Sequence, residues 1–545
     1  MDPIQALGLL GISWILWKLL RHWVLPSPLD NIPGPPPEAF LTGVYSKLFS
    51  NNAWAYHKTI HSTYGNTMLI HGMLGEKELY TYDPKALHHI FVKDQYVFEE
   101  SDQFIHTNNL LFGPGLLGTL GNQHRKQRKM LNPVFSIAHM REMTPVFYGI
   151  SHKLKDAFLK RVQNGPQEIE VVAWMTRTAL ELVCQSGLGH SFDTLEDDTA
   201  PHPYAAAVKT LVPKLSSPMM RYASGFVLPR VCRIGPAFFR RWVVNAFPWK
   251  SLHDVRDIID ILNSTSIDIF ESKKEALAEG DKGLENQIGQ GKDIMSILMR
   301  ANMTASTEET LSRDELIGQM STLMFAAMDT TSSALSRLLH LLSLHPEVQN
   351  KLRNEINEAS DAEGGDLSYD KVVSLPYLDA ICRETLRLYS PVVTVNRVAR
   401  QDTVLPLMNP IKGINGEEMG EIAVRNGTKV TIGLMASNTN PRLWGADADE
   451  WKPERWLSPL PDEVTAAHLP GVYSNLMTFI GGSRACIGFK FSQLEMKVVL
   501  SLLIQAFRFS PSKAQIFWQM SGIVVPIVVG GDPNTPQLPL VVERV

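Results

Sequence analysis

Hydrophobic and polar positions follow two different periods along this chain. Near the N-terminal side, residues 67–73 and 78–82 have the composition of a short β-hairpin, and a helix is expected after them over about 84–93. Farther along, apolar residues recur at helical spacing, and helices are predicted over 141–162, 174–186, 254–280 and 314–344. The last is the longest apolar helix and should end at His345-Pro346, because the residue before a proline is disfavoured in a helix.

A second β-rich region is predicted between residues 403 and 432. The fold class is therefore mainly α with small β-sheet regions. By length alone, 545 residues would suffice for roughly three or four domains of ordinary size. No fixed-period repeat and no sharp internal boundary is visible, so we predict a single large catalytic domain over residues 41–545.

The N-terminus has its own pattern. Residues 4–17 carry no charge, and the apolar character continues past Lys18 and Arg21 to Leu25. A bilayer span needs about twenty apolar residues, which this stretch supplies if the two cations reach back to the interface. A cleaved signal peptide instead expects cations before the apolar run. We predict a retained membrane anchor over 1–25, a proline-rich hinge over 26–40, and a cytosolic location for the rest.

Composition and charge narrow the class of protein. The net charge is −4, 44% of residues are hydrophobic, and the four cysteines include no CxxC pair. This composition excludes a disulfide-stapled scaffold and favours a reducing compartment. It also gives no reason to expect a nucleic acid as a partner.

The richest candidate site is FIGGSRACIG, residues 479–488. A cysteine alone is most often an inert buried thiol. Here glycines allow close approach of the backbone to a flat ligand, and Arg484 can pair with an anionic group on that ligand. A helix predicted over 489–507 favours a thiolate at its N-terminus. Cys486 in this setting is a candidate axial haem ligand.

These residues resemble the haem-binding signature FxxGxRxCxG of the cytochrome P-450 family. Its fixed positions are filled by Phe479, Gly482, Arg484, Cys486 and Gly488. The resemblance implies the cytochrome P-450 fold with haem b (iron protoporphyrin IX) as cofactor. It also implies that the Cys486 thiolate is the proximal iron ligand, which favours cleavage of the O–O bond.

Glu384 and Arg387 lie three residues apart in a predicted helix over 378–389, and PERW follows at 453–456. The alternative for such spacing is an exposed ion pair on the helix surface that contributes little to stability. The apolar surroundings instead resemble the family's ExxR element, which implies a buried structural triad of Glu384, Arg387 and Arg455.

Polar residues interrupt the long apolar helix at AAMDTT, residues 326–331. The threonines can simply bond back to carbonyls one turn earlier. The run also resembles the family's oxygen-activation motif AGxDTT, with Ala327 where glycine is common. The resemblance implies that Asp329 and Thr330 are catalytic and relay protons to iron-bound dioxygen.

A basic run, GNQHRKQRK, occupies residues 121–129. A solvated basic face is the default interpretation, and a nucleic-acid patch is isolated and disfavoured. In the family this position often has WxxxR, which implies that His124 and Arg128 bind a haem propionate. The remaining cations fit a docking face for an acidic reductase. Arg397 matches a further propionate-binding arginine of the family.

The run GPGLLG at 113–118 matches the dinucleotide pattern GxGxxG. That pattern counts only between a strand and a helix, and residues 108–112 make a poor strand. The chain therefore has no visible NAD or flavin module of its own. Electrons should come from NADPH through cytochrome P-450 reductase, with cytochrome b5 as a further candidate donor.

The sequence as a whole predicts a haem-thiolate monooxygenase in the endoplasmic reticulum membrane, single-pass, with its catalytic domain on the cytosolic face. Apolar positions suit a lipophilic substrate, such as a terpenoid in fungal secondary metabolism. Residues 211–249 mix Phe, Trp, Pro and Arg, as either a membrane-contacting segment or a core helix would. Two other functions stay open: a haem-thiolate isomerase or dehydratase needing no reductase, and a non-catalytic haem- or lipid-binding membrane protein.

Overall fold

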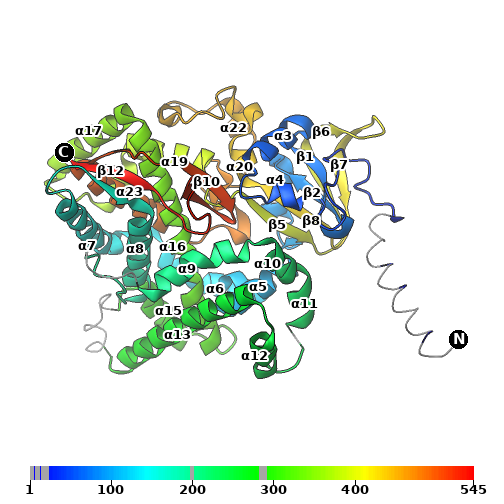
Figure 1. Cartoon of the computed structure of the whole chain (residues 1–545), viewed down its shortest axis with the longest axis horizontal. Helices are drawn as coiled ribbons and strands as arrows, with labels where there is room; N and C mark the ends of the chain where they lie inside the picture. The colour runs from blue at the N-terminus through cyan, green and yellow to red at the C-terminus, as the bar shows by residue number, and fades with distance from the viewer. Residues whose placement is uncertain are drawn as a thin grey trace. The chain divides into compact units, whose positions relative to one another are not determined.

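The computed structural model describes residues 5, 13, 17, 24–196, 202–232, 234–280 and 291–545. The chain divides into two compact units. The first unit comprises 1–101, 393–448 and 461–485, and the second comprises 102–392, 449–460 and 486–545. The mainly helical class predicted from the sequence is confirmed, with small sheets in each unit (Figure 1).

The first unit is built around a five-stranded sheet of order β1-β2-β8-β5-β3, beside a two-stranded β6-β7 ribbon. Its strands are β1 (Thr67–His71), β2 (Lys77–Thr81), β3 (Phe98–Glu99), β5 (Thr394–Ala399), β6 (Thr403–Lys412), β7 (Glu418–Val424) and β8 (Lys429–Gly433). Its helices are α2 (Tyr45–Leu48), α3 (Trp54–Tyr64), η1 (Met73–Gly75), α4 (Pro84–His88), η2 (His89–Lys93), α20 (Leu434–Asn438), α21 (Pro441–Trp444), α22 (Asp462–Ala466), η8 (Met477–Phe479) and η9 (Gly482–Arg484).

The predicted hairpin is confirmed as β1 and β2, which pair antiparallel with Met68 opposite Tyr80. Strand β8 then adds parallel to β2, so the end of the second β-rich region joins the first sheet, while β6 and β7 pair only with each other. One face of β1 and β2 packs against α2 and α3 through a buried apolar cluster that includes Val44, Ile60 and Ile70. Burial of such side chains is the main favourable contribution to folding.

Residues 29–34 of the predicted hinge pack against the sheet of the first unit, to which they belong. Leu29 and Ile32 are buried, and the Leu69 amide donates to the Pro33 carbonyl at 3.1 Å. A Cβ added to Gly34 would lie 1.8 Å from the Leu69 carbonyl oxygen, so only glycine fits this approach. We call residues 26–34 the proline strap. It packs on the sheet edge and does not run free as a spacer.

The second unit holds most of the helices and two small sheets, β4-β12-β9 and β10-β11. Its first helices are α5 (Asp102–Phe112), η3 (Leu116–Gly118), α6 (Gly121–Leu131), η4 (Asn132–Phe135), α7 (Ile137–Arg161), α8 (Val171–Val183), η5 (Cys184–Leu188), α9 (Pro203–Leu215), α10 (Pro218–Tyr222), η6 (Ala223–Val227), α11 (Leu228–Val231) and α12 (Ala237–Ala246). The others are α13 (Lys250–Ala278), α15 (Ile294–Thr304), α16 (Arg313–Leu344), α17 (Pro346–Glu363), α18 (Tyr369–Ser374), α19 (Pro376–Leu388), η7 (Pro453–Leu457) and α23 (Phe489–Ala506). The strands are β4 (Gln167–Glu170), β9 (Phe507–Pro511), β10 (Ile516–Ser521), β11 (Ile523–Val528) and β12 (Pro539–Arg544).

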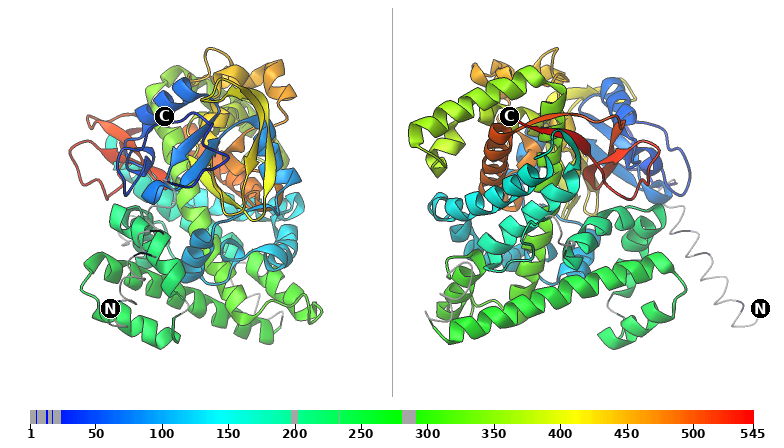
Figure 2. Two further views of the ribbon diagram at one scale, coloured as in Figure 1. Left: turned by 90° about the vertical axis from the view of Figure 1, so that its right-hand side faces the viewer. Right: turned by 60° about the vertical axis from the view of Figure 1, so that its left-hand side comes forward.

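Helix α16 is the central element of this unit and packs against α8, α13 and α23 (Figure 2). A capping box between Ser312 and Glu315 starts it, and it ends before His345-Pro346 as predicted. Most of its residues are buried, but Phe325, Ala326, Ala327 and Thr330 are partly exposed in mid-helix. The helix therefore has an open face where the oxygen-activation motif lies.

The predicted anchor over residues 1–25 falls almost wholly outside the described residues. Within the described part of the chain, no helix combines the length and apolar character that a membrane crossing requires.

Candidate functional site

Cys486 differs from the three other cysteines, because its side chain is exposed while Cys184 and Cys382 are buried and Cys232 is half-buried. It lies just before Gly488, the N-cap of α23. The pKa of the Cys486 thiol is raised above its ordinary value, because the protein around the sulfur disfavours its charged form; the Gly488 amide and the charge of Arg128 offset part of this rise. An amide donor, a nearby cation and a helix N-terminus are the groups that stabilise a thiolate.

The segment before the cysteine belongs to the first unit, where glycines fit it against neighbouring backbone. Gly482 has a φ of +67°, and an added Cβ would lie 1.6 Å from the carbonyl oxygen of Phe91. The Ser483 amide donates to Gln95 Oε1 at 2.8 Å. Phe479 packs edge-on against Tyr473, with ring centroids 5.8 Å apart. Any side chain at position 482 would push this segment off its support.

Arg397 and Arg484, both predicted to bind propionates, come together in the first unit with two glutamates. Arg397 Nη1 lies 2.8 Å from Glu100 Oε1, and Arg484 Nη2 lies 3.4 Å from Glu99 Oε2. Burial lowers the pKa of Arg484, and Glu100 and Glu99 raise it. We call Glu99, Glu100, Arg397 and Arg484 the open cluster, because the buried Arg397 Nη2 has no hydrogen-bond partner.

The basic residues of helix α6 lie on two different faces of the helix. His124 is buried and Arg128 is half-buried, whereas Arg125 and Lys129 are exposed. His124 and Arg128 are four residues apart and share one side of the helix. Lys129 is not a free cation, since it forms an exposed ion pair with Glu309 at 2.5 Å.

Asp329 and Thr330 occupy neighbouring positions on α16 with different contacts. Lys209 Nζ on α9 lies 2.6 Å from Asp329 Oδ1, and both side chains are largely buried. Thr330 Oγ1 donates to the Ala326 carbonyl at 2.9 Å, the local bond that the sequence left open as the simpler alternative. Thr330 nevertheless faces the open stretch of α16.

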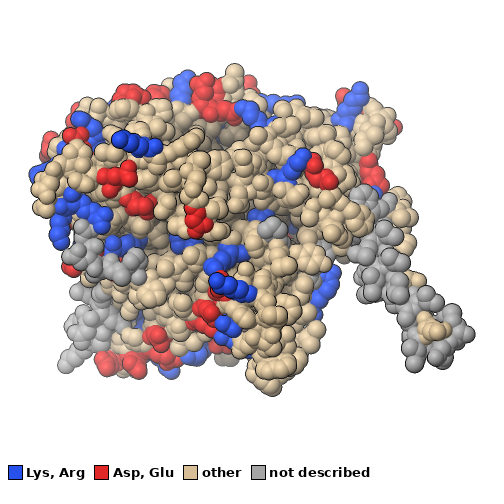
Figure 3. Space-filling view, viewed as in Figure 1, with Lys and Arg blue, Asp and Glu red and all other residues tan. Residues whose placement is uncertain are grey.

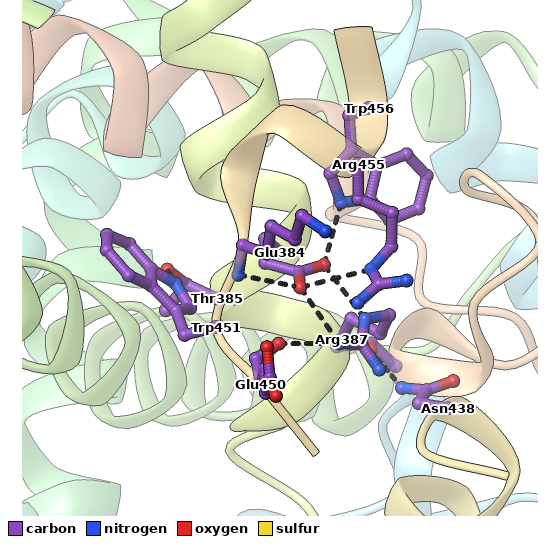
Figure 4. Close-up of polar contacts among 10 residues, drawn as sticks. Glu384, Thr385, Arg387, Asn438, Glu450, Trp451, Arg455 and Trp456 are labelled. Carbon is purple, nitrogen blue, oxygen red and sulfur yellow. Dashed lines mark hydrogen bonds and ion pairs between the residues drawn. The ribbon is translucent and has the colours of Figure 1, made fainter. Parts of the chain in front are cut away.

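The structure brings Glu384, Arg387 and Arg455 together in the second unit (Figure 4). Arg387 donates from Nε to Glu384 Oε2 and from Nη2 to Oε1, both at 2.8 Å. Arg455 Nε donates to Oε1 at 3.4 Å. Both Glu384 and Arg387 are fully buried, so the surface-pair alternative is wrong. We call these three residues with Trp456 the closed cluster.

Several polar partners were missed by sequence reasoning. Trp456 Nε1 donates to Glu384 Oε2 at 2.9 Å, and the Lys452 amide donates to Oε1 at 3.1 Å. Trp456 belongs to the PERW run, so the sequence could have indicated it as a further partner of Glu384. Glu99, Glu100 and Lys209 carried no local signal, because their partners are far away in the sequence.

The GxGxxG run follows helix α5 and forms the short η3 turn. Its glycines serve close packing inside the second unit, where an added Cβ on Gly115 would lie 2.5 Å from the Gly318 carbonyl oxygen of α16. The rejection of a dinucleotide site at this run agrees with the helix that precedes it.

Comparison with known proteins finds similarity over almost the whole chain. The family model described as "Cytochrome P450" matches residues 33–527. Cytochrome P450 monooxygenase 91 of Postia placenta is 51% identical over 100% of this chain and 99% of its own length. A ganoderic acid synthetase of Ganoderma lucidum is 44% identical over 99% of each chain.

Proposed function

Because this chain belongs to the cytochrome P450 monooxygenase family, we propose that it oxidises a lipophilic terpenoid with electrons delivered by a reductase. Proteins of this family use haem iron as cofactor. The observation that carries the proposal is Cys486, the only exposed cysteine of the four, at the N-terminus of α23.

The residues present fit a haem. Cys486 offers a sulfur donor beside the Gly488 amide. Arg397 keeps a buried donor, Nη2, without any partner, and a propionate is an anion that would satisfy it. The partly exposed Ala326, Ala327 and Thr330 leave an open face on α16. We propose that Cys486 binds the iron and that His124, Arg128, Arg397 and Arg484 bind the propionates, with Phe479 beside the cofactor.

When bound, the haem supplies activation of dioxygen through a thiolate-ligated iron. The chain's own residues perform three tasks around it. The amide of Gly488 and the charge of Arg128 each lower the pKa of the Cys486 thiol, which burial raises, and so favour the thiolate form that binds iron. The small side chains of Ala326 and Ala327 leave room on the open face. Thr330 Oγ1 and the Asp329 carboxylate hold and pass protons, which is a general acid role.

Electron delivery is proposed to come from NADPH–cytochrome P450 reductase, with cytochrome b5 as a second donor. The exposed Arg125 of α6 supports an acidic docking partner. The same helix carries Arg128, whose charge acts on Cys486. A docked acidic partner would therefore lie near the helix that supports the proposed iron ligand.

A terpenoid substrate is supported by the relative named as a ganoderic acid synthetase. Phe325 on the open face of α16 agrees with such a ligand, and its ring centroid lies 4.6 Å from that of the buried Phe112. Aromatic and aliphatic linings bind lipophilic ligands by removing apolar surface from water.

Attachment to the endoplasmic reticulum membrane, through an anchor over residues 1–25, remains part of the proposal. The surface of α12 supports contact with lipid, since none of its residues is buried. Phe238 is 77% exposed and Trp242 is 65% exposed. The core-helix alternative is wrong for α12. Figure 3 shows few charged side chains over this part of the surface, at the lower centre. Exposed aromatic residues with arginines are typical of a membrane interface.

The iron ligand is tested by the carbon monoxide difference spectrum of the reduced, haem-loaded protein. We expect a red-shifted Soret band that is lost in Cys486→Ser and kept in the matched variant Cys232→Ser. A band unchanged in Cys486→Ser would overturn the assignment.

The reaction class is tested by product formation from a panel of farnesol, geranylgeraniol, squalene and lanosterol, with and without reductase and NADPH. We expect oxygenated product that depends on both. Turnover without reductase would instead indicate isomerase or dehydratase chemistry.

A further inference from the structure

Arg337, in the C-terminal half of α16, is a buried cation without a counter-ion. Its side chain belongs to a residue that is only 9% exposed. Within the described part of the chain, no carboxylate oxygen lies within 4.0 Å of its guanidinium, and its side chain forms no hydrogen bond. Burial lowers the pKa of Arg337 to about 9. A charge taken out of water is costly unless an opposite charge or hydrogen bonds compensate it.

Other buried arginines of the second unit show what compensation looks like in this protein. Arg177 donates twice to Asp193, at 2.6 and 2.7 Å. Arg353 donates from Nε to the Ile504 carbonyl at 2.7 Å. Arg337 has neither kind of partner, although it is buried to a similar degree. The N–H groups of Arg337 are therefore available to an acceptor that comes from outside the chain.

Two aromatic rings contact the Arg337 guanidinium. Its central carbon lies 3.6 Å from the ring centroid of Trp518 on β10 and 4.3 Å from that of Tyr389, which follows α19. Such contacts use the flat face of the guanidinium and leave the N–H groups at its edge. The edge presents a planar fork of donors, which matches the two oxygens of a carboxylate.

Neighbouring side chains add donors and no negative charge. Trp518 Nε1 donates to His340 Nδ1 at 3.0 Å, so the proton of the neutral imidazole is on Nε2. Burial and the charge of Arg337 lower the pKa of His340 to about 4, which keeps the ring neutral at pH 7. The Tyr389 hydroxyl forms no hydrogen bond with any described residue. His340 and Tyr389 are half-buried, so solvent reaches this group. We call Arg337, His340, Tyr389 and Trp518 the stacked cluster.

The stacked cluster is separate from the open face of α16. Arg337 follows Thr330 by seven residues, which is about 10 Å along a helix axis. Between them, the buried Ser333 donates to the Val524 carbonyl of β11 at 2.6 Å. Strand β11 therefore covers the helix between the two places, and the reacting part of a substrate at Thr330 would not touch the guanidinium.

We propose that the stacked cluster binds a carboxylate, with the guanidinium edge of Arg337 as its main contact. The carboxylate supplies the missing negative charge, and the His340 and Tyr389 donors surround it. Two sources have this chemistry. One is the carboxyl end of a terpenoid acid, and this source rests on the proposed function. The other is a free small acid, which does not depend on it. Binding forms and breaks no covalent bond.

Isothermal titration calorimetry of the haem-loaded protein tests the site with acetate, farnesoic acid and the neutral analogue farnesol. We expect Arg337→Met to weaken binding of acetate and of farnesoic acid by about tenfold or more, and to leave binding of farnesol unchanged. Arg337→Lys keeps the charge without the fork and should weaken acetate by about threefold to tenfold. Acetate binding that is absent, or equal in the parent and Arg337→Met, would overturn the proposal.

The matched control is Arg313→Met at the start of the same helix. Arg313 also contacts an aromatic ring, that of Phe270 at 5.5 Å, but it already has a carboxylate partner in Glu271 at 2.7 Å. We expect this variant to bind acetate as the parent does. An equal loss of acetate binding in Arg313→Met and Arg337→Met would indicate a general charge effect and would overturn the site.

Thermal unfolding followed by circular dichroism gives a second readout. Because a ligand that binds only the folded state stabilises it, acetate should raise the melting temperature of the parent by about 2 °C or more. It should leave that of Arg337→Met unchanged, which also controls for ionic strength. Equal shifts in both proteins would mean that Arg337 serves only to stack on the two rings.

The same measurements distinguish the two sources. Farnesoic acid that binds about tenfold more tightly than acetate, and competes with it, indicates the terpenoid acid. Equal affinities indicate the free small acid. Neither measurement uses NADPH or reductase, so their failure overturns the carboxylate site alone. The proposed function has its own tests in the carbon monoxide spectrum and in product formation.

Discussion

The two buried clusters of arginine and glutamate differ in how completely their hydrogen bonds are satisfied. In the closed cluster, both oxygens of Glu384 accept from Arg387, and Arg455 and Trp456 add further donors. In the open cluster, Arg397 and Arg484 each meet one glutamate, and the buried Arg397 Nη2 has no partner. Both clusters use the same two residue types in the protein interior.

The difference separates a structural role from a binding role. A buried polar network that is complete holds one arrangement and has no capacity for a ligand. An unpaired buried donor costs free energy until a partner meets it. The closed cluster is therefore expected to determine folding, and the open cluster to determine retention of the anionic cofactor.

The largest expected effect comes from removing the acceptor of the closed cluster. Glu384→Ala leaves Arg387 buried without its counter-ion, so we expect the free energy of unfolding to fall by about 3–5 kcal/mol. Urea unfolding followed by circular dichroism measures the loss. The control is Glu309→Ala, which breaks the exposed pair with Lys129 and should cost about 1 kcal/mol or less. Equal effects in the two variants would remove the distinction between the clusters.

Arginine-to-lysine replacements should affect stability in the closed cluster and haem release in the open cluster. Arg387→Lys loses the two-point contact with Glu384, and we expect a loss of about 2 kcal/mol in urea unfolding. Arg397→Lys keeps a charge beside Glu100 and should cost about 1 kcal/mol or less. It should nevertheless release haem about tenfold faster to an acceptor globin, because the free donor is lost. Haem release that is faster in Arg387→Lys than in Arg397→Lys would reverse the two roles.

A smaller effect is expected from the indole in the closed cluster. Trp456→Phe removes the 2.9 Å hydrogen bond to Glu384 Oε2 while keeping an aromatic ring. We expect a cost of about 1.5 kcal/mol in urea unfolding and an unchanged rate of haem release. A change in haem release without a change in stability would show that this cluster also serves the cofactor.

The smallest effect concerns the pH dependence of the open cluster. Burial raises the pKa of Glu100, and Arg397 and Arg484 lower it, with a net rise above its ordinary value. The contribution of Glu100 to stability is therefore present below about pH 4.3, the unfolded value, and is lost as the pH rises through the folded pKa. The Glu100→Gln variant cannot lose this contribution, so its stability relative to the parent should rise between pH 5 and pH 8. Urea unfolding at the two pH values measures this difference, and a constant difference would refute the sign.

Sequence patterns predicted the features that depend on interactions between neighbouring residues, such as helix ends and side-chain pairs one turn apart. The helix over 314–344 was found as α16, since apolar periodicity and the His345-Pro346 stop act within a few residues. Helix α7 begins earlier than its predicted start at 141 and continues through Pro145, because packing of its buried face outweighs one lost backbone hydrogen bond. Glu384 and Arg387 were paired correctly because they lie one turn apart.

Contacts that tertiary packing creates were not predicted from the sequence. Lys209 and Asp329 are separated by 120 residues, and nothing near either position marks the other as a partner. Glu99 is the last residue of a two-residue strand, and Glu100 follows it; propensity alone does not identify such a short strand. Such partners depend on which helices and strands come side by side, and the local pattern of one segment does not contain that information.

The proline strap has a mechanical consequence. Leu29 and Ile32 are buried and Gly34 fits against Leu69, so the chain is clamped to the edge strand β1 from about residue 29 onward. A load applied at residue 25 would therefore pass into the sheet after only a few residues of slack. Tension would be resisted by side-chain burial and backbone hydrogen bonds acting in shear, with little elastic extension of a linker to absorb it.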